Sequence, residues 1–190
     1  MTTVDRILQD WRIRKAVPHI QSGDRVLDLG SADGVLFDRL GCCGPGSIGI
    51  DPTLPADHRT RQGFRMVRGF FPEDLPPGSG PFDVIVMLAV LEHFPESGYS
   101  GLARGCARLL KPGGRLVISV PSPAVDAMLG VLVKVRLVHG MSLEEHHGYD
   151  IAKTPEIFPE PDFTLRTHET FQLGLNNLFV FERTGTQRSG

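Results

Sequence analysis

Short runs of apolar residues alternate along the chain with polar and turn-rich segments. Five of these runs predict buried strands, at residues 25–30, 47–51, 64–69, 82–88 and 115–120. Several are continuously apolar rather than alternating, which is typical of parallel strands covered on both faces. The pattern therefore predicts a doubly wound α/β fold built on a mostly parallel sheet.

Helices and a hairpin complete this pattern. Residues 4–17 and residues 101–110 place apolar side chains at helical spacing, so each segment predicts an amphipathic helix. Residues 163–168 and 178–183 predict two more strands, joined by a connection that contains Gly174. We expect these two strands to form an antiparallel hairpin at one edge of the sheet.

Composition narrows the class of protein. The chain has 190 residues and a net charge of −2, without the basic excess of a general nucleic-acid binder. No apolar run has the length of a membrane span, and no signal peptide is apparent at the N-terminus. The three cysteines show no zinc-type spacing, so we expect no metal site and a reduced, cytoplasmic compartment.

The first strand leads into a turn of small residues, Val26-Leu-Asp-Leu-Gly-Ser-Ala-Asp-Gly34. Ligands of open α/β sheets bind at the carboxyl ends of the strands, where glycine lets the backbone approach them. The second strand ends at Asp51, about 20 positions further on, the usual place of the acid that binds a ribose diol. The plainer alternatives are a tight turn and an aspartate that starts a turn before Pro52.

These two segments, with 82–93 and 109–121, resemble class I S-adenosylmethionine-dependent methyltransferases, in particular the small stand-alone type 11 group. All four segments occur in the family's order and spacing, over residues 20–121, and the final hairpin matches more loosely. The resemblance implies a Rossmann-like, seven-stranded sheet with an antiparallel C-terminal strand. It also implies S-adenosyl-L-methionine as cofactor and S-adenosyl-L-homocysteine as product.

The resemblance further implies one methyltransferase-like domain, 1–190. Its parts are an N-terminal helix (1–20), a cofactor-binding core (21–121), a variable substrate or lid segment (122–162) and a C-terminal β-hairpin (163–184).

The resemblance assigns cofactor contacts by position. Asp28 would act near the methionine ammonium, Asp51 would accept the ribose hydroxyls, and Pro52 would lie against the adenine. The small residues of the first turn would line the methionine and ribose, and residues 87–89 would border the sulfonium. The cofactor-binding residues implied are Asp28, Gly30, Ser31, Ala32, Gly34, Asp51, Pro52, Phe70, Phe71, Met87 and Leu88.

Two positions depart from the family's pattern. Ala32 stands where the family usually has glycine, and alanine disfavours positive φ. Phe70 and Phe71 stand where many relatives carry an aspartate for the adenine amino group. The adenine is then expected to be held by stacking and backbone N–H groups, with Glu73 or Asp74 as a possible substitute.

The residues that would act on the methyl acceptor lie outside the cofactor motifs. Methyl transfer is an in-line displacement, and a hydroxyl acceptor needs a base. His146 or His147 is the favoured base, with Tyr149 orienting the substrate; a polar lid loop and a metal site are the alternatives. His93 is a further catalytic candidate, and its alternative role is a structural hydrogen bond.

Methyl transfer to a small-molecule or carrier-linked acceptor is the leading hypothesis. A non-catalytic S-adenosylmethionine-binding or scaffold module is the alternative, which Ala32 and the missing aspartate would suit. A nicotinamide-dependent enzyme is disfavoured because residues 30–35 do not match Gly-x-Gly-x-x-Gly. The apolar segment 124–139 predicts a helix that serves as core, as an acceptor wall or as a homodimer surface. No nucleic-acid partner is expected.

Overall fold

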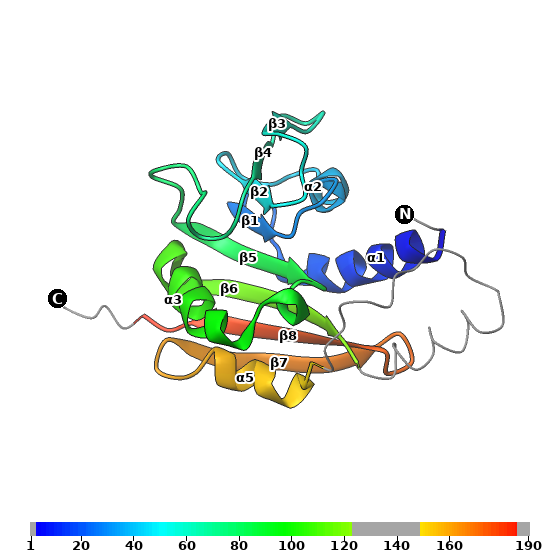
Figure 1. Cartoon of the computed structure of the whole chain (residues 1–190), viewed down its shortest axis with the longest axis vertical. Coiled ribbons are helices and arrows are strands. Elements are labelled where there is room, and N and C mark those ends of the chain that lie inside the picture. Colours follow the sequence, from blue (N-terminus) through cyan, green and yellow to red (C-terminus); the bar gives the residue numbers. More distant parts are fainter. Residues whose placement is uncertain (1–2, 123–148, 186–190) are drawn as a thin grey trace.

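The computed structural model describes residues 3–122 and 149–185, with side chains described from residue 6 onward. One sheet of eight strands, in the order β3-β4-β2-β1-β5-β6-β8-β7, runs through the molecule (Figure 1). The strands are β1 Val26–Leu29, β2 Ile48–Asp51, β3 His58–Arg59, β4 Arg65–Arg68, β5 Phe82–Leu88, β6 Leu110–Pro121, β7 Phe163–Phe171 and β8 Asn176–Arg183.

The sheet confirms the predicted fold class. Strands β4, β2, β1, β5 and β6 are mutually parallel, and β8 pairs antiparallel with both β6 and β7. The sheet has eight strands rather than seven because the two-residue β3 pairs antiparallel with β4. β6 also begins earlier than predicted, since Leu110 pairs with Phe82 across a bulge before the regular register resumes at Arg115.

Helices cover both faces of the sheet. They are α1 Thr3–Ala16, α2 Val35–Leu40, α3 Tyr99–Leu109 and α5 Thr154–Ile157, with 3-10 turns η1 Val17–His19, η2 Leu91–His93, η3 Glu96–Gly98 and η4 Ile151–Lys153. Within the described ranges, no helix is both long and apolar enough to cross a membrane.

Strand alternation divides the buried apolar residues into two clusters. Leu27 and Leu29 of β1 belong to the cluster that includes residues of α3 and α5. Val26 belongs to the other cluster, with residues of α1 and α2. Because successive side chains of a strand point to opposite faces, Asp28 lies on the α1 side.

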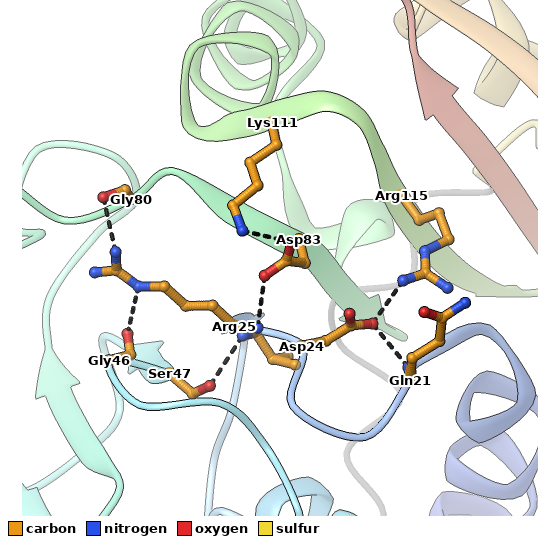
Figure 2. Close-up of polar contacts among 10 residues, drawn as sticks. Gln21, Asp24, Arg25, Gly46, Ser47, Gly80, Asp83, Lys111 and Arg115 are labelled. Carbon is orange, nitrogen blue, oxygen red and sulfur yellow. Dashed lines mark hydrogen bonds and ion pairs between the residues drawn. The ribbon is translucent and has the colours of Figure 1, made fainter.

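A polar network fixes the amino ends of the parallel strands (Figure 2). Asp24 pairs with Arg115 at 2.6 Å, and Lys111 pairs with Asp83 at 2.6 Å. The Arg25 backbone N–H donates to Asp83 Oδ2 at 2.9 Å, and its guanidinium donates to two loop carbonyls. These contacts hold β1, β5 and β6 together at this edge. The loops that line the cavities described below follow the opposite, carboxyl ends of the strands.

Asp83 makes this network sensitive to acid. Partial burial acts to raise its pKa, but hydrogen bonds from Lys111 and from the Arg25 N–H outweigh it and hold the pKa below the ordinary value. Stability from Asp83 is therefore complete above the unfolded-state pKa and is lost as pH falls through the folded-state pKa.

We expect Asp83→Asn to lower the free energy of unfolding by about 1 kcal/mol at neutral pH, measured by urea unfolding. In acid the variant should match the wild type; an equal loss at both pH values would contradict this assignment.

Candidate cofactor site

The first turn is shaped by glycine at two positions where the backbone requires it. Gly30 follows β1 with φ +71°, and a Cβ placed there would lie 2.3 Å from Val90 Cγ2. Gly34 precedes α2 with φ +75°, and a Cβ placed there would lie 3.1 Å from Thr60 Cγ2. Any side chain at Gly30 would be both strained and in collision, so backbone forms the floor of the site at this point.

Ala32 adopts a left-handed conformation in the same turn, with φ +41°. Its N–H donates to Asp51 Oδ2 at 2.9 Å. The alanine therefore keeps the turn that glycine would favour, at a cost in backbone strain of about 1–2 kcal/mol.

The carboxylate of Asp51 joins the ends of β1 and β2. Besides Ala32, it accepts hydrogen bonds at Oδ1 from the Thr53 N–H at 2.7 Å and the Thr53 hydroxyl at 2.6 Å. Only 6% of Asp51 is exposed. A carboxylate offers about four acceptor positions, so binding two hydroxyls of a diol requires the Thr53 hydroxyl to rotate away from Oδ1.

Asp28 is a buried carboxyl on β1. Burial, and then the charges of Asp51 and Asp33, raise its pKa well above the ordinary value. A cationic group beside Asp28 would offset this penalty, which makes the position suited to an ammonium.

Two cavities meet over Gly30 and Val90, which line both. The first, of about 220 Å³, is mainly apolar and includes Ile50, Pro52, Phe70, Phe71 and Phe94. The second, of about 270 Å³, is more polar and includes Gln9, Arg12, Asp28, Ser31, Ala32 and Leu88. An elongated ligand with an apolar ring at one end and charged groups at the other fits this pair of cavities.

The two phenylalanines after β4 lie differently within the first cavity. Phe70 is 67% exposed at its mouth, whereas Phe71 packs against α3, where a Cβ on Gly105 would lie 2.8 Å from its ring. Asp74 folds back on this loop, and its Oδ2 accepts the Phe70 N–H at 2.8 Å. One of its oxygens is therefore already engaged by the backbone.

Met87 and Leu88 are separated by strand alternation. Leu88 lines the second cavity, whereas Met87 is fully buried in the cluster on the α3 side and lines neither cavity. Neighbouring residues of a strand face opposite sides, so only one of this pair reaches the site directly.

The predicted catalytic residues are not all brought together. His93 lies on η2 and lines the first cavity. Tyr149 lines neither cavity; its hydroxyl contacts the Thr154 hydroxyl at 2.9 Å, and burial raises its pKa. His146 and His147 lie outside the described residues. Among those that are described, no three His, Cys, Asp or Glu side chains are grouped to hold a metal ion.

Sequence reasoning did not find Gln9 and Arg12, which α1 brings to the second cavity. Their helix was expected, but helical periodicity does not tell which polar side chain reaches the carboxyl edge of the sheet. Arg12 Nε donates to Asn176 Oδ1 at 3.3 Å, so the C-terminal hairpin takes part in placing it.

Strand order, the glycine turn and the aspartate that ends β2 define a class I S-adenosylmethionine-dependent methyltransferase. The family described as "Methyltransferase domain" matches residues 3–155, and the chain belongs to this family.

The chain is 32% identical to a ubiquinone biosynthesis O-methyltransferase from Xanthomonas oryzae over 147 residues, which cover 72% of the chain and 59% of that protein. It spans about half the length of most of the curated relatives that it matches.

Two solved structures share the fold at low identity. The magnesium protoporphyrin IX methyltransferase from Synechocystis with bound S-adenosylhomocysteine superposes with a TM-score of 0.63 at 20% identity, covering 97% of this chain and 89% of that one. The 1,6-didemethyltoxoflavin-N1-methyltransferase from Burkholderia thailandensis gives 0.67 at 18% identity, covering 95% and 80%.

Strain at Ala32 can be measured. We expect Ala32→Gly to raise the free energy of unfolding by about 0.5–1 kcal/mol, because relief of the left-handed strain exceeds the entropy that glycine adds to the unfolded chain. Ala103→Gly, in the middle of α3, is the matched control and should lower stability by about 1 kcal/mol. A loss of stability in both variants would show that residue 32 is unstrained.

Proposed function

We propose that the chain binds S-adenosyl-L-methionine across the two cavities and transfers its methyl group to a small-molecule or carrier-linked acceptor. The observation that carries the proposal is the junction over Gly30, where an apolar cavity and a charged cavity meet. Asp51 itself lines neither cavity, but its carboxylate accepts the N–H of Ala32, which lines the second. Adenine would lie against Pro52 and Phe70, and the ribose would lie near Asp51.

The second cavity offers opposite charges for the amino-acid part of the cofactor. Asp28 suits the ammonium because it is buried and its pKa is raised. Arg12 suits the carboxylate because a guanidinium donates two parallel N–H groups to such an anion. The buried Ser31 hydroxyl, which has no hydrogen-bond partner among the described residues, offers a further polar contact.

The bound cofactor supplies an activated methyl group on a sulfonium. The chain's own residues hold and orient that cofactor and the acceptor, and such positioning contributes roughly 7–11 kcal/mol to methyl transfer. A hydroxyl acceptor also needs a base. His93, from the rim of the first cavity, is the described candidate, and roles for His146, His147 and Tyr149 stay predictions.

The names of the relatives support a small acceptor. The curated relatives are O-methyltransferases of ubiquinone biosynthesis, and one structural relative holds 1,6-didemethyltoxoflavin. We propose an oxygen or nitrogen atom of a small molecule as the methyl acceptor here. A homodimer, a cytoplasmic location and the lack of a nucleic-acid partner stay predictions from the sequence.

A non-catalytic binding module remains the alternative function. Ala32 and the missing aspartate at the adenine edge both suit a decayed site, yet the Ala32 N–H still reaches Asp51. The turn therefore shows no loss of this contact, which weakens the argument for a decayed site. A module that only holds the cofactor would share the same turn, so the choice between the two functions depends on catalysis. Formation of a methylated product from a panel of hydroxylated and amino aromatic acceptors separates the two.

Cofactor binding is tested first by calorimetric titration with S-adenosylmethionine and S-adenosylhomocysteine, using NADH as the control ligand. We expect Asp51→Ala to weaken both by about 5- to 150-fold, which corresponds to the loss of about 1–3 kcal/mol of polar contacts. Denaturant unfolding of the variant checks that its fold persists. A folded wild-type chain that binds neither ligand would overturn the proposal.

Proton release provides a second test. In the free chain burial raises the pKa of Asp28, and a bound ammonium would lower it again. Binding of S-adenosylhomocysteine should then release protons, and affinity should rise with pH between the bound-state and free-state pKa values. Calorimetry in two buffers of different ionisation enthalpy measures this release. Asp28→Asn removes the titrating group, so an unchanged proton release in that variant would contradict the assignment of the released protons to Asp28.

A further inference from the structure

The β7–β8 hairpin turn lies at the same sheet edge as the proposed cofactor site. Asn176, at the start of β8, pairs with Pro121 at the carboxyl end of β6, and β6 runs parallel to β5. Figure 1 shows this turn at the end of the sheet to which β5 and β6 point. A side-chain contact between the turn and α1 confirms that the two elements are neighbours, since Gln172 Nε2 donates to the Leu8 carbonyl at 3.2 Å.

Two buried amides link this turn to Arg12. Arg12 Nε donates to Asn176 Oδ1 at 3.3 Å, Asn176 Nδ2 donates to Gln172 Oε1, and Gln172 donates to the Leu8 carbonyl. Asn176 is 1% exposed and Gln172 is 6% exposed. Arginine only donates and a carbonyl only accepts, so the two ends of the chain of bonds fix the orientation of both amides.

The hydrogen-bonded chain of Arg12, Asn176, Gln172 and the Leu8 carbonyl, called the amide relay below, explains why the turn is strained. Gln172 and Leu173 both have positive φ, +54° and +58°, although neither is glycine. The Leu173 side chain is fully exposed and makes no packing contribution to this conformation. The buried Gln172 side chain stabilises this conformation, because the left-handed turn brings its amide between Asn176 and α1. Such strain persists where surrounding contacts over-determine it, and it clusters at functional sites.

The relay also constrains the guanidinium. Arg12 lines the second cavity, and its Nε–H is directed to Asn176. A planar guanidinium can bind a carboxylate through Nε and one Nη group or through both Nη groups. Because Nε donates to Asn176, this contact fixes the plane of the guanidinium and orients the second of these pairs. Holding a long side chain in its binding conformation removes entropy that would otherwise be lost on binding.

We propose that Asn176 and Gln172 are positioning residues that hold Arg12 for the carboxylate of the cofactor's methionine part. The proposal rests on the proposed function, since it requires that the second cavity take the amino-acid end of S-adenosylmethionine. The C-terminal hairpin thereby sets cofactor affinity without touching the cofactor itself.

The test compares two ligands that differ in the amino-acid part. S-Adenosylhomocysteine carries the carboxylate, whereas 5′-methylthioadenosine has the adenosine and sulfur without it. Dissociation constants for both are measured by calorimetry on the full chain. Arg12→Met should lower the affinity for S-adenosylhomocysteine about 10- to 150-fold and leave the affinity for 5′-methylthioadenosine unchanged. Asn176→Leu should weaken S-adenosylhomocysteine about three- to tenfold, again without affecting the shorter ligand.

Two further variants separate positioning from general stability. The double variant Arg12→Met/Asn176→Leu should bind S-adenosylhomocysteine no more weakly than Arg12→Met alone, because Asn176 acts through Arg12. Glu169→Gln is the matched control: it removes the 3.3 Å ion pair with Lys15 that also ties the hairpin to α1, and it should leave both affinities unchanged. If Asn176→Leu does not fold, Gln172→Leu carries the same expectation of a selective loss.

Each contrary outcome has a distinct meaning. Equal weakening of both ligands in Asn176→Leu, or no weakening of either, would overturn the positioning role. A wild-type chain that binds neither ligand would instead overturn the proposed function.

Discussion

The buried carboxylate of Asp51 is the interaction on which the site depends. It accepts the N–H of Ala32 from the first turn and two donors from Thr53 after β2. A buried charge is tolerated only when such donors surround it. The contacts that satisfy Asp51 therefore also set the distance between the two turns. This distance places the Asp51 carboxylate near the backbone at Gly30.

The two edges of the sheet divide stability from binding. At the amino edge, Asp24, Asp83 and their cationic partners satisfy one another, and the Arg25 side chain is bound to loop carbonyls. At the carboxyl edge, the hydroxyl of Ser31, which lines the second cavity, is buried without a hydrogen-bond partner among the described residues. Buried polar groups are normally paired, so groups left unpaired in a cavity are places where a ligand can supply the partner.

Sequence reasoning succeeded where a local signal was strong. The bounds of β5 agree with the predicted 82–88, because a continuous apolar run is flanked by turn residues. It failed for β3, an exposed two-residue strand with no apolar pattern, and for the early part of β6, where Leu110 pairs across a bulge. Glycine and aspartate spacing predicted a tight turn at Gly30 and a strand that ends at Asp51, and both are present. The position of Arg12 depends instead on how α1 docks against the hairpin.

The departure from the family pattern at Phe70 and Phe71 bears on how adenine would be held. Asp74, which could have replaced the missing aspartate, has one oxygen on the Phe70 N–H and so shapes the loop that carries the two phenylalanines. That loop presents Phe70 at the mouth of an apolar cavity and packs Phe71 under α3. In the proposed binding mode, recognition of the ring would rely on stacking and cavity shape more than on a carboxylate. Affinity in this mode would then come mainly from the charged end, where Arg12 and Asp28 lie. The buried amides that contact Arg12 would therefore influence binding even though they lie far from the adenine.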